Sequence, residues 1–260
     1  MGVTDSDQGN LEVARDFNGS TDRIDYPSAF DTTGQAITIS VWAWCDDDTP
    51  GAIQYLFNSA SSGGVAGTIF YLPSGVSTAL TFQRIGTASL VRTSNASQFT
   101  AGQWNHFLVT HDGVISTGAS SHIYVNGTEV SYILTENGSG ETTANSGFQL
   151  GGRSSDDARN FDGRLAEPGV WNRVASAGEI AALAKGFPPS DFPYLLKFHD
   201  PLIRAVGNRR GGAATLDGTT VIAHPRIIRR VPNLWRPNVA GAAPAEFPWH
   251  YYAQQRQMAA

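Results

Sequence analysis

Residues Ala36 to Trp44 (AITISVWAW) alternate in character, as expected of a β-strand whose two faces meet different surroundings. One face carries Ile37, Ile39, Val41, Ala43 and Cys45, and the other carries Thr38, Ser40, Trp42 and Trp44. Shorter β-rich runs follow at Tyr55–Asn58, Gly67–Leu72, Ala79–Ile85, Trp104–His111, Ser121–Asn126 and Thr128–Ile133. Clusters of Gly, Ser, Asn and Asp separate these runs, and this spacing predicts an antiparallel sandwich or barrel.

Two local signals predict a turn and a helix. Asn126-Gly127 in HIYVNGTEV supplies the two positive-φ residues of a type I′ turn, which predicts a hairpin. In SAGEIAALAKG, Ser176 and Glu179 can form a capping box, and Gly186 is placed to end the helix. We therefore expect the only substantial helix of the body at Ala177–Lys185.

A proline-rich stretch, FPPSDFP, follows Gly186 and indicates a boundary. We expect three regions: an N-terminal segment (residues 1–10), a body (residues 11–186) and a C-terminal extension (residues 187–260). In the extension, ATLDGTTV predicts a β-hairpin with Asp217-Gly218 at its tip. The prolines of the next stretch, HPRIIRRVPNLWRPN, favour an extended arm with hydrophobic residues spaced along it.

The composition is that of a folded protein with a full core, because the chain has 260 residues of which 41% are hydrophobic. The single cysteine, Cys45, excludes an internal disulfide, and we expect it to be a buried, inert thiol. Met1 is followed by the polar GVTDSDQGN, and no apolar run approaches the roughly 20 residues of a membrane span. We therefore expect a soluble protein, made in the cytoplasm without a signal peptide and with no membrane partner.

Charge is distributed unevenly along the chain. Residues 187–260 carry nine basic and four acidic residues, a net charge of +5, in a chain whose net charge is −5. Residues 1–186 therefore carry −10. A basic extension on an acidic body favours contact with an acidic surface, either its own or a neighbour's. Nucleic acid is not an expected partner, because the basic residues are dispersed and form no known binding motif.

Six stretches occur in an order that resembles a known family. They are DFNGSTDRIDYP, ITISVWAW, GQWNHFLVTHDG, HIYVNGTEV, FQLGGR and FDGRLAEPGVWNRVASAGEIAAL, within roughly Leu11 to Lys185. This order is similar to that of the laminin-G-like, concanavalin A-like jelly roll. The resemblance implies an all-β fold of two antiparallel sheets packed face to face, with the first and last strands adjacent. The turns Phe17-Asn18-Gly19 and Phe161-Asp162-Gly163 should then lie near one another, and Trp104 and Trp171 should be structural.

The stretch from LLKFHDPLIRAV to HPRII is similar to the C-terminal extension of laminin-G-like proteins that tailed bacteriophages encode. This resemblance implies a structural virion protein, a capsid decoration or cement subunit located on the virion and anchored through its extension. The expected contact residues are Arg226, Ile227, Ile228, Arg229, Arg230, Trp235, Arg236, Trp249 and Tyr251. Their partner would be the capsid protein or neighbouring copies of this chain, and the alternative is an arm that wraps its own sandwich.

Catalysis is not expected. Glycoside hydrolases, which are common among concanavalin A-like folds, need two carboxylates across the scissile bond. The Glu-x-Asp-x-x-Glu run of the laminarinase type does not occur, and Glu129, Glu136, Glu141 and Glu167 are isolated. We therefore expect a non-enzyme with no catalytic residues.

Calcium is the one metal that the resemblance suggests, since laminin-G-like folds often bind Ca²⁺ in loops at the sheet edge. The candidate oxygen ligands are Asp16, Asn18 and Asp22 of the first turn, with Asp162 of the facing turn. The competing interpretation is that these side chains bond the backbone of their own tight turns, and it is the one we favour. No cofactor is therefore expected to be required.

Glycan binding is the alternative function, as a lectin-like module or adhesin on a particle or cell surface. Trp42 and Trp44 share one face of their strand, and a sugar can stack on exposed tryptophan. The competing interpretation, which is the one that we favour, is that the tryptophan face packs in the sandwich core while the arm or helix covers the aliphatic face.

Overall fold

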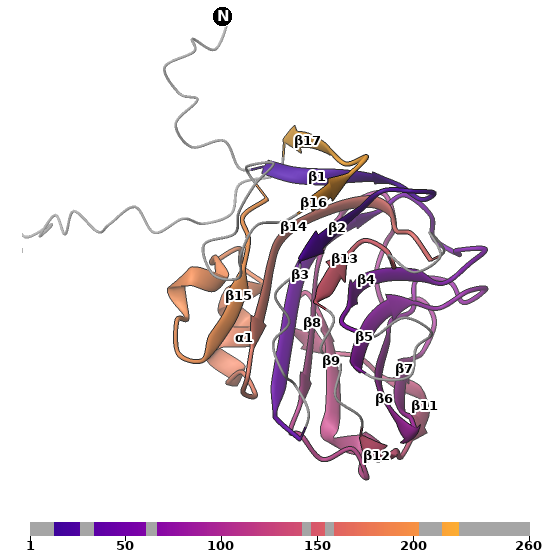
Figure 1. The fold of residues 1–260 in the computed structure, drawn as a ribbon, viewed down its shortest axis with the longest axis vertical. Helices are drawn as coiled ribbons and strands as arrows, with labels where there is room; N and C mark the ends of the chain where they lie inside the picture. The colour runs from indigo at the N-terminus through magenta and orange to yellow at the C-terminus, as the bar shows by residue number, and fades with distance from the viewer. Residues whose placement is uncertain are drawn as a thin grey trace, which may run out of the picture. The chain divides into compact units, whose positions relative to one another are not determined.

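The computed structural model describes residues 13–26, 34–60, 67–141, 147–153, 159–202 and 215–223 (Figure 1). Its strands form two antiparallel sheets, which confirms the predicted jelly-roll sandwich. Sheet A has the order β10 (Thr128–Glu129), β9 (Ser121–Val125), β8 (Trp104–His111), β3 (Ile37–Cys45), β14 (Asp162–Trp171), β1 (Val13–Asn18) and β17 (Thr220–Ala223), and β15 (Leu196–His199) also pairs with β14.

Sheet B lies against sheet A (Figure 1). Its order is β11 (Tyr132–Glu136), β7 (Leu90–Ser94), β6 (Thr81–Ala88), β5 (Gly67–Leu72), β4 (Gln54–Asn58), β13 (Phe148–Leu150), β2 (Arg23–Tyr26) and β16 (Thr215–Asp217), and β12 (Ser139–Glu141) also pairs with β6. The described residues include the helix α1 (Ala177–Leu183) and the short 3₁₀ turns η2 (Gly118–Ser120) and η3 (Pro189–Asp191). Within the described ranges, no helix combines the length and apolar character needed to cross a membrane.

The core lies between the two sheets and is made of the alternate residues that face inward from each. Sheet A contributes Ile39, Val41 and Phe107 among others, and sheet B contributes Phe70 and Phe82. The aliphatic face of β3 is thus the inner one, and the prediction that its tryptophan face packs in the core is wrong. The physical reason is that the branched aliphatic row interdigitates with the phenylalanines of sheet B, whereas α1 packs on the outer face of sheet A.

The helix begins where the capping box predicts. The Ser176 side chain accepts a hydrogen bond from the backbone N–H of Glu179, and the Glu179 carboxylate accepts one from the backbone N–H of Ser176. The helix ends at Leu183, slightly before the predicted Lys185. Gly186 has a φ of +87°, and the N–H groups of Gly186 and Phe187 donate to the carbonyls of Leu183 and Ala182. This is the left-handed glycine termination that the sequence indicates.

The first and last strands of the body are adjacent, as the family resemblance implies. Strand β1 pairs with β14, with Phe17 opposite Gly163 and Asn18 opposite Asp162. The Gly19 N–H donates to the Phe161 carbonyl at 3.0 Å, which brings the two predicted turns together. The Asn126-Gly127 turn also forms as predicted, with φ values of +50° and +83° between the paired strands β9 and β10.

The extension contributes strands to both sheets. Strand β15 pairs with β14, β16 pairs with β2 in sheet B, and β17 pairs with β1 in sheet A. The turn at Asp217-Gly218 exists, but its two strands pair with different sheets and not with each other. The prediction of a hairpin is therefore wrong in its pairing, because the edge strands β1 and β2 offer open backbone groups on either side of this turn.

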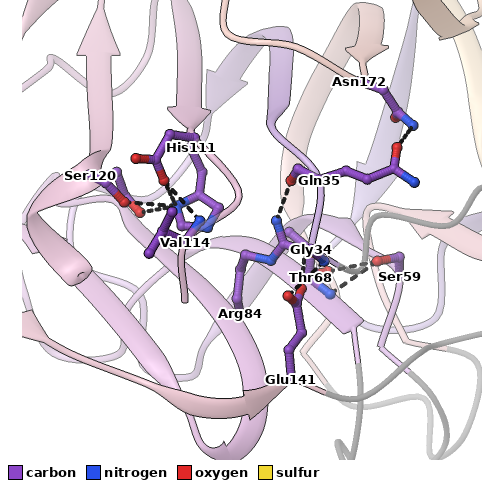
Figure 2. A network of polar contacts seen from close by, with 12 residues as sticks. Gly34, Gln35, Ser59, Thr68, Arg84, His111, Val114, Ser120, Glu141 and Asn172 are labelled. Atoms are coloured by element: carbon purple, nitrogen blue, oxygen red, sulfur yellow. Dashed lines mark hydrogen bonds and ion pairs between the residues drawn. The ribbon is translucent and has the colours of Figure 1, made fainter. Parts of the chain in front are cut away.

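One end of the sandwich holds a buried ion pair (Figure 2). The Arg84 side chain is fully buried, and its guanidinium pairs with Glu141 and donates to the Gln35 carbonyl at 2.9 Å. The Gly34 N–H donates to the other Glu141 oxygen at 2.8 Å. This network joins β6, β12 and the segment that leads into β3.

Candidate functional site

The predicted glycan-binding residue Trp44 lies on the outer face of sheet A, half-buried in a row of side chains. Its ring meets Trp104 edge to face, with centroids 6.2 Å apart, and the Arg164 guanidinium lies over it at 4.9 Å. The Arg164 Nε is 3.2 Å from the Asp16 carboxylate, and the Trp44 Nε1 donates to Asp46 at 2.8 Å. A sugar could stack on the face under Arg164 only by displacing that side chain.

Trp42 lies on the same outer face of sheet A and contacts His106 there. Its ring lies 5.2 Å from that of His106, whose side chain is fully buried and whose Nε2 is 2.8 Å from the Ser40 hydroxyl. Burial lowers the pKa of His106 to about 3, so this imidazole is neutral at neutral pH. The part of sheet A beyond this row is covered by α1, because Ile180 packs with Leu108 and Trp171. Trp171 is buried, as expected of a structural residue.

The structure places the four candidate calcium ligands near the junction of β1 and β14. The Asn18 side-chain oxygen accepts hydrogen bonds from the N–H groups of Ser20, Thr21 and Asp22 at 2.9, 2.9 and 3.2 Å. Asp22 is buried and accepts from the Asn18 N–H at 3.2 Å. Both side chains therefore stabilise their own turn, as the interpretation that we favoured requires.

Asp162 lies near other negatively charged side chains, and Asp16 is one of them. The pKa of Asp162 is raised, first by burial and then by the neighbouring carboxylates of Asp46, Asp47 and Asp16. In the parts of the chain that the structure describes, no group of three or more His, Cys, Asp or Glu side chains is arranged to hold a metal ion. Calcium binding at Asp16, Asn18, Asp22 and Asp162 stays the untested alternative.

The isolated glutamates of the sequence make separate contacts. Glu141 pairs with Arg84, Glu167 pairs with His199 at 2.6 Å, and Glu129 accepts hydrogen bonds from Tyr132 at 2.8 Å and from His122 at 2.7 Å. None of these contacts joins two of the glutamates. Cys45 is buried, as predicted, and burial raises the pKa of its thiol.

The outer face of sheet B carries a second aromatic surface. Its strands place Tyr55 opposite Tyr71, and Tyr71 opposite Thr81. The two tyrosine rings are tilted, with centroids 5.8 Å apart, and Tyr55 is buried whereas Tyr71 is half-buried. Beside this row, Gln83 lies opposite Val91 in the register of β6 and β7. A partly exposed aromatic ring flanked by amide and hydroxyl groups suits a ligand that has both apolar faces and hydroxyl groups.

Charged groups flank these tyrosines. The Arg159 guanidinium lies 5.8 Å from the Tyr55 ring, and Glu136 is exposed on the edge strand β11. The pKa of Tyr71 is raised, first by burial and then by Tyr55, while Thr81 and Arg159 oppose the rise and Glu136 adds to it. Arg159 and Glu136 thus act on Tyr71 with opposite sign. We call Tyr55, Tyr71, Gln83, Arg159 and Glu136 the sheet B surface.

Sequence reasoning missed the sheet B surface. Tyr55 and Tyr71 lie in runs recognised as strands, but their shared outer face follows from the pairing of β4 with β5 and from a register shift between Tyr55 and Phe57. Arg159 reaches them from a loop far along the chain. The available signal was the alternation of tyrosine with inward Phe70 and Leu72, which assigns Tyr71 to the opposite face.

The residues predicted to contact a partner lie outside the described residues. These are Arg226, Ile227, Ile228, Arg229, Arg230, Trp235, Arg236, Trp249 and Tyr251. Their role stays a prediction.

A model of the laminin-G type, described as the concanavalin A-like lectin/glucanases superfamily, matches residues 18–181. The chain belongs to this superfamily. The match extends from the first turn to the helix α1 and so includes both aromatic surfaces. No curated protein matches the chain.

Two solved structures are similar to the chain. The chain is similar to a "putative carbohydrate binding protein" from Bacteroides ovatus, with 17% identity, a TM-score of 0.56 and coverage of 84% of this chain and 62% of that one. It is also similar to a heptameric SAP-like pentraxin from Limulus polyphemus, with 13% identity, a TM-score of 0.49 and coverage of 84% and 98%. At 17% identity the likeness to the Bacteroides protein concerns the fold. This chain thus spans less than two thirds of the Bacteroides protein.

Proposed function

We propose that this protein is a carbohydrate-binding module and that it binds its glycan on the sheet B surface. The observation that carries the proposal is the half-buried Tyr71, set beside Tyr55 on a face that also presents Gln83. A sugar ring offers C–H groups that stack on an aromatic face, and its hydroxyl groups bond amide and hydroxyl side chains. The Bacteroides protein of similar fold, described as carbohydrate binding, supports this choice.

The test is binding of the purified chain to a panel of soluble polysaccharides, measured by affinity electrophoresis. Tyr71→Ala should weaken binding about tenfold or more, since a central aromatic contact commonly dominates such a site. Tyr194→Ala is the matched control, because Tyr194 is 72% exposed and lies just before β15. If Trp44→Ala abolishes binding while Tyr71→Ala does not, the glycan site is the tryptophan row of sheet A. If no polysaccharide binds, the proposal is wrong.

The proposal is for binding without catalysis. The glutamates Glu141, Glu167 and Glu129 are each engaged in contacts within the fold, which favours structural roles for them. We expect no new reducing ends when the protein is incubated with the polysaccharides that it binds. Release of reducing ends that is lost in a Glu136→Gln variant would contradict this expectation.

The second candidate is a structural role on a virion, and the observation that favours it is the charge and composition of the extension. Residues 187–260 have a net charge of +5 and contain aromatic, arginine and proline residues typical of contact segments. A chain that ends at Ala223 should lose attachment to capsids in co-sedimentation while keeping its thermal melt. Unchanged attachment would place the contact elsewhere, and a lowered melting temperature would favour an arm that wraps its own sandwich.

A further inference from the structure

Arg159 is held beside the tyrosines of the sheet B surface by its backbone as well as by its side chain. Its φ is +70°, a left-handed conformation that is uncommon outside glycine. Its carbonyl accepts a hydrogen bond from the Tyr55 N–H at 2.9 Å, and its guanidinium lies 5.8 Å from the Tyr55 ring. Because the backbone is tied to β4, the side chain is presented at one side of this face.

The guanidinium of Arg159 lacks an acidic partner among the described residues, and its buried Nε has no hydrogen-bond acceptor there. Arg92 likewise has a buried Nε without an acceptor among the described residues, whereas three other arginines pair with carboxylates. Arg23 pairs with Asp25, Arg164 with Asp16, and Arg173 with Glu179. A buried N–H group without an acceptor is costly, and a guanidinium is shaped to bind a carboxylate through two parallel hydrogen bonds.

We propose that the sheet B surface selects a sugar that carries a carboxylate, such as a uronic or sialic acid, and that Arg159 binds the carboxylate while Tyr71 packs against the sugar ring. This inference rests on the proposed function and names the class of ligand for the same site. Arg159 supplies the positive charge that pairs with the carboxylate of the ligand.

Glu136 gives the ligand an orientation. It is exposed on β11 and lies opposite Val91, the neighbour of Gln83 in the register of the sheet. Its negative charge repels a carboxylate, whereas Arg159 attracts one. The acidic group of the sugar therefore points to the β4 side of Tyr71, and the neutral end of the ligand extends toward β11.

The experiment compares ligand pairs that differ in charge, by isothermal titration calorimetry with the full chain. One pair is trigalacturonate and its methyl ester, and the other is sialyllactose and lactose, so the two arms distinguish uronic from sialic acids. The acidic member of at least one pair should bind about tenfold more tightly than its neutral counterpart. This preference should fall as salt is added, because exposed charges are screened.

Variants of single charged residues identify which residue causes the preference for the acidic sugar. Arg159→Gln should remove the preference for the acid, and Arg159→Lys should restore part of it. Arg164→Gln, which removes a positive charge from the opposite face, should retain the preference. Glu136→Gln should strengthen binding of the acid about two- to threefold by removing a repulsive charge. If a thermal melt shows that Arg159→Gln does not fold, the Arg159→Lys and Glu136→Gln variants provide the test instead.

The possible outcomes distinguish failure of this inference from failure of the proposed function. Binding that depends on Tyr71 but is equal for acidic and neutral sugars would overturn the role of Arg159 and leave carbohydrate binding standing. A preference for the acid that survives Arg159→Gln would also overturn it. If no sugar binds through Tyr71, both proposals are wrong.

Discussion

Single residues decide how one end of the sandwich is held together. Arg84 faces the interior of sheet B, where an unpaired charge would be very costly, and Glu141 supplies the counter-charge (Figure 2). Glu141 also accepts the Gly34 N–H at 2.8 Å, so one carboxylate satisfies two segments that are distant in sequence. The ion pair therefore matters because loss of the Glu141 carboxylate would leave the positive charge of Arg84 buried without this counter-charge.

Glu141→Gln should lower the free energy of unfolding by about 3–5 kcal/mol, because it removes the carboxylate that pairs with the buried Arg84 charge. Urea denaturation at neutral pH measures this change. Glu136→Gln is the control, since that glutamate is exposed and its replacement should alter stability by about 0.5 kcal/mol or less. Equal stability of the two variants would contradict the structural role of the ion pair.

At the scale of elements, the strands of the extension complete the sandwich. Strand β17 covers the outer edge of β1, and β16 covers that of β2. The turn between them is tightly packed, because a Cβ atom on Gly218 would lie 1.8 Å from the Asp22 carboxylate. The boundary expected at residue 186 therefore does not divide the sheets. Strands β16 and β17, which follow it, pair with β2 and β1, which precede it.

A chain that ends at Ala223 should keep the stability of the body, whereas one that ends at Leu202 should unfold at a lower temperature. The shorter chain lacks β16 and β17, which leaves the backbone groups of β1 and β2 unpaired at both sheet edges. Thermal melts of the two truncated chains measure the difference. Identical melting temperatures would show that the edge strands contribute nothing to stability.

At the scale of the whole molecule, two buried histidines make stability depend on pH. Burial lowers the pKa of His106 to about 3, and burial together with the Arg84 charge lowers that of His111 to about 4, from an ordinary value of 6.5. Between those values and pH 6.5, the unfolded chain binds protons that the folded chain does not. Stability therefore falls as the pH decreases below about 6.5 and is unaffected by these groups above it.

At pH 5, each of these two histidines should cost about 2 kcal/mol of stability relative to pH 7, since a pKa difference of one unit corresponds to about 1.4 kcal/mol. Urea denaturation at the two pH values measures the total. His106→Gln should reduce the dependence on pH, because it removes one of the two groups. A free energy of unfolding that is the same at pH 5 and pH 7 would contradict this account.

The sequence by itself determined the local features and the class of fold. The alternation along β3, the capping box of Ser176 and Glu179, and the Asn126-Gly127 turn depend on neighbours a few residues apart, so the pattern predicts them directly. The order of six such stretches then indicated the jelly roll. The adjacency of β1 and β14 followed from that resemblance.

Only the tertiary structure decided which face of β3 is buried, which strands β16 and β17 join, and which residues share the sheet B surface. An alternating strand with aliphatic residues on one face and tryptophans on the other has two hydrophobic faces, and only the opposing sheet selects between them. Strand partners are likewise chosen by open edges elsewhere in the fold. Tyr55, Tyr71 and Arg159 meet through a strand register and a loop conformation, and contacts of this kind leave no local pattern in the chain.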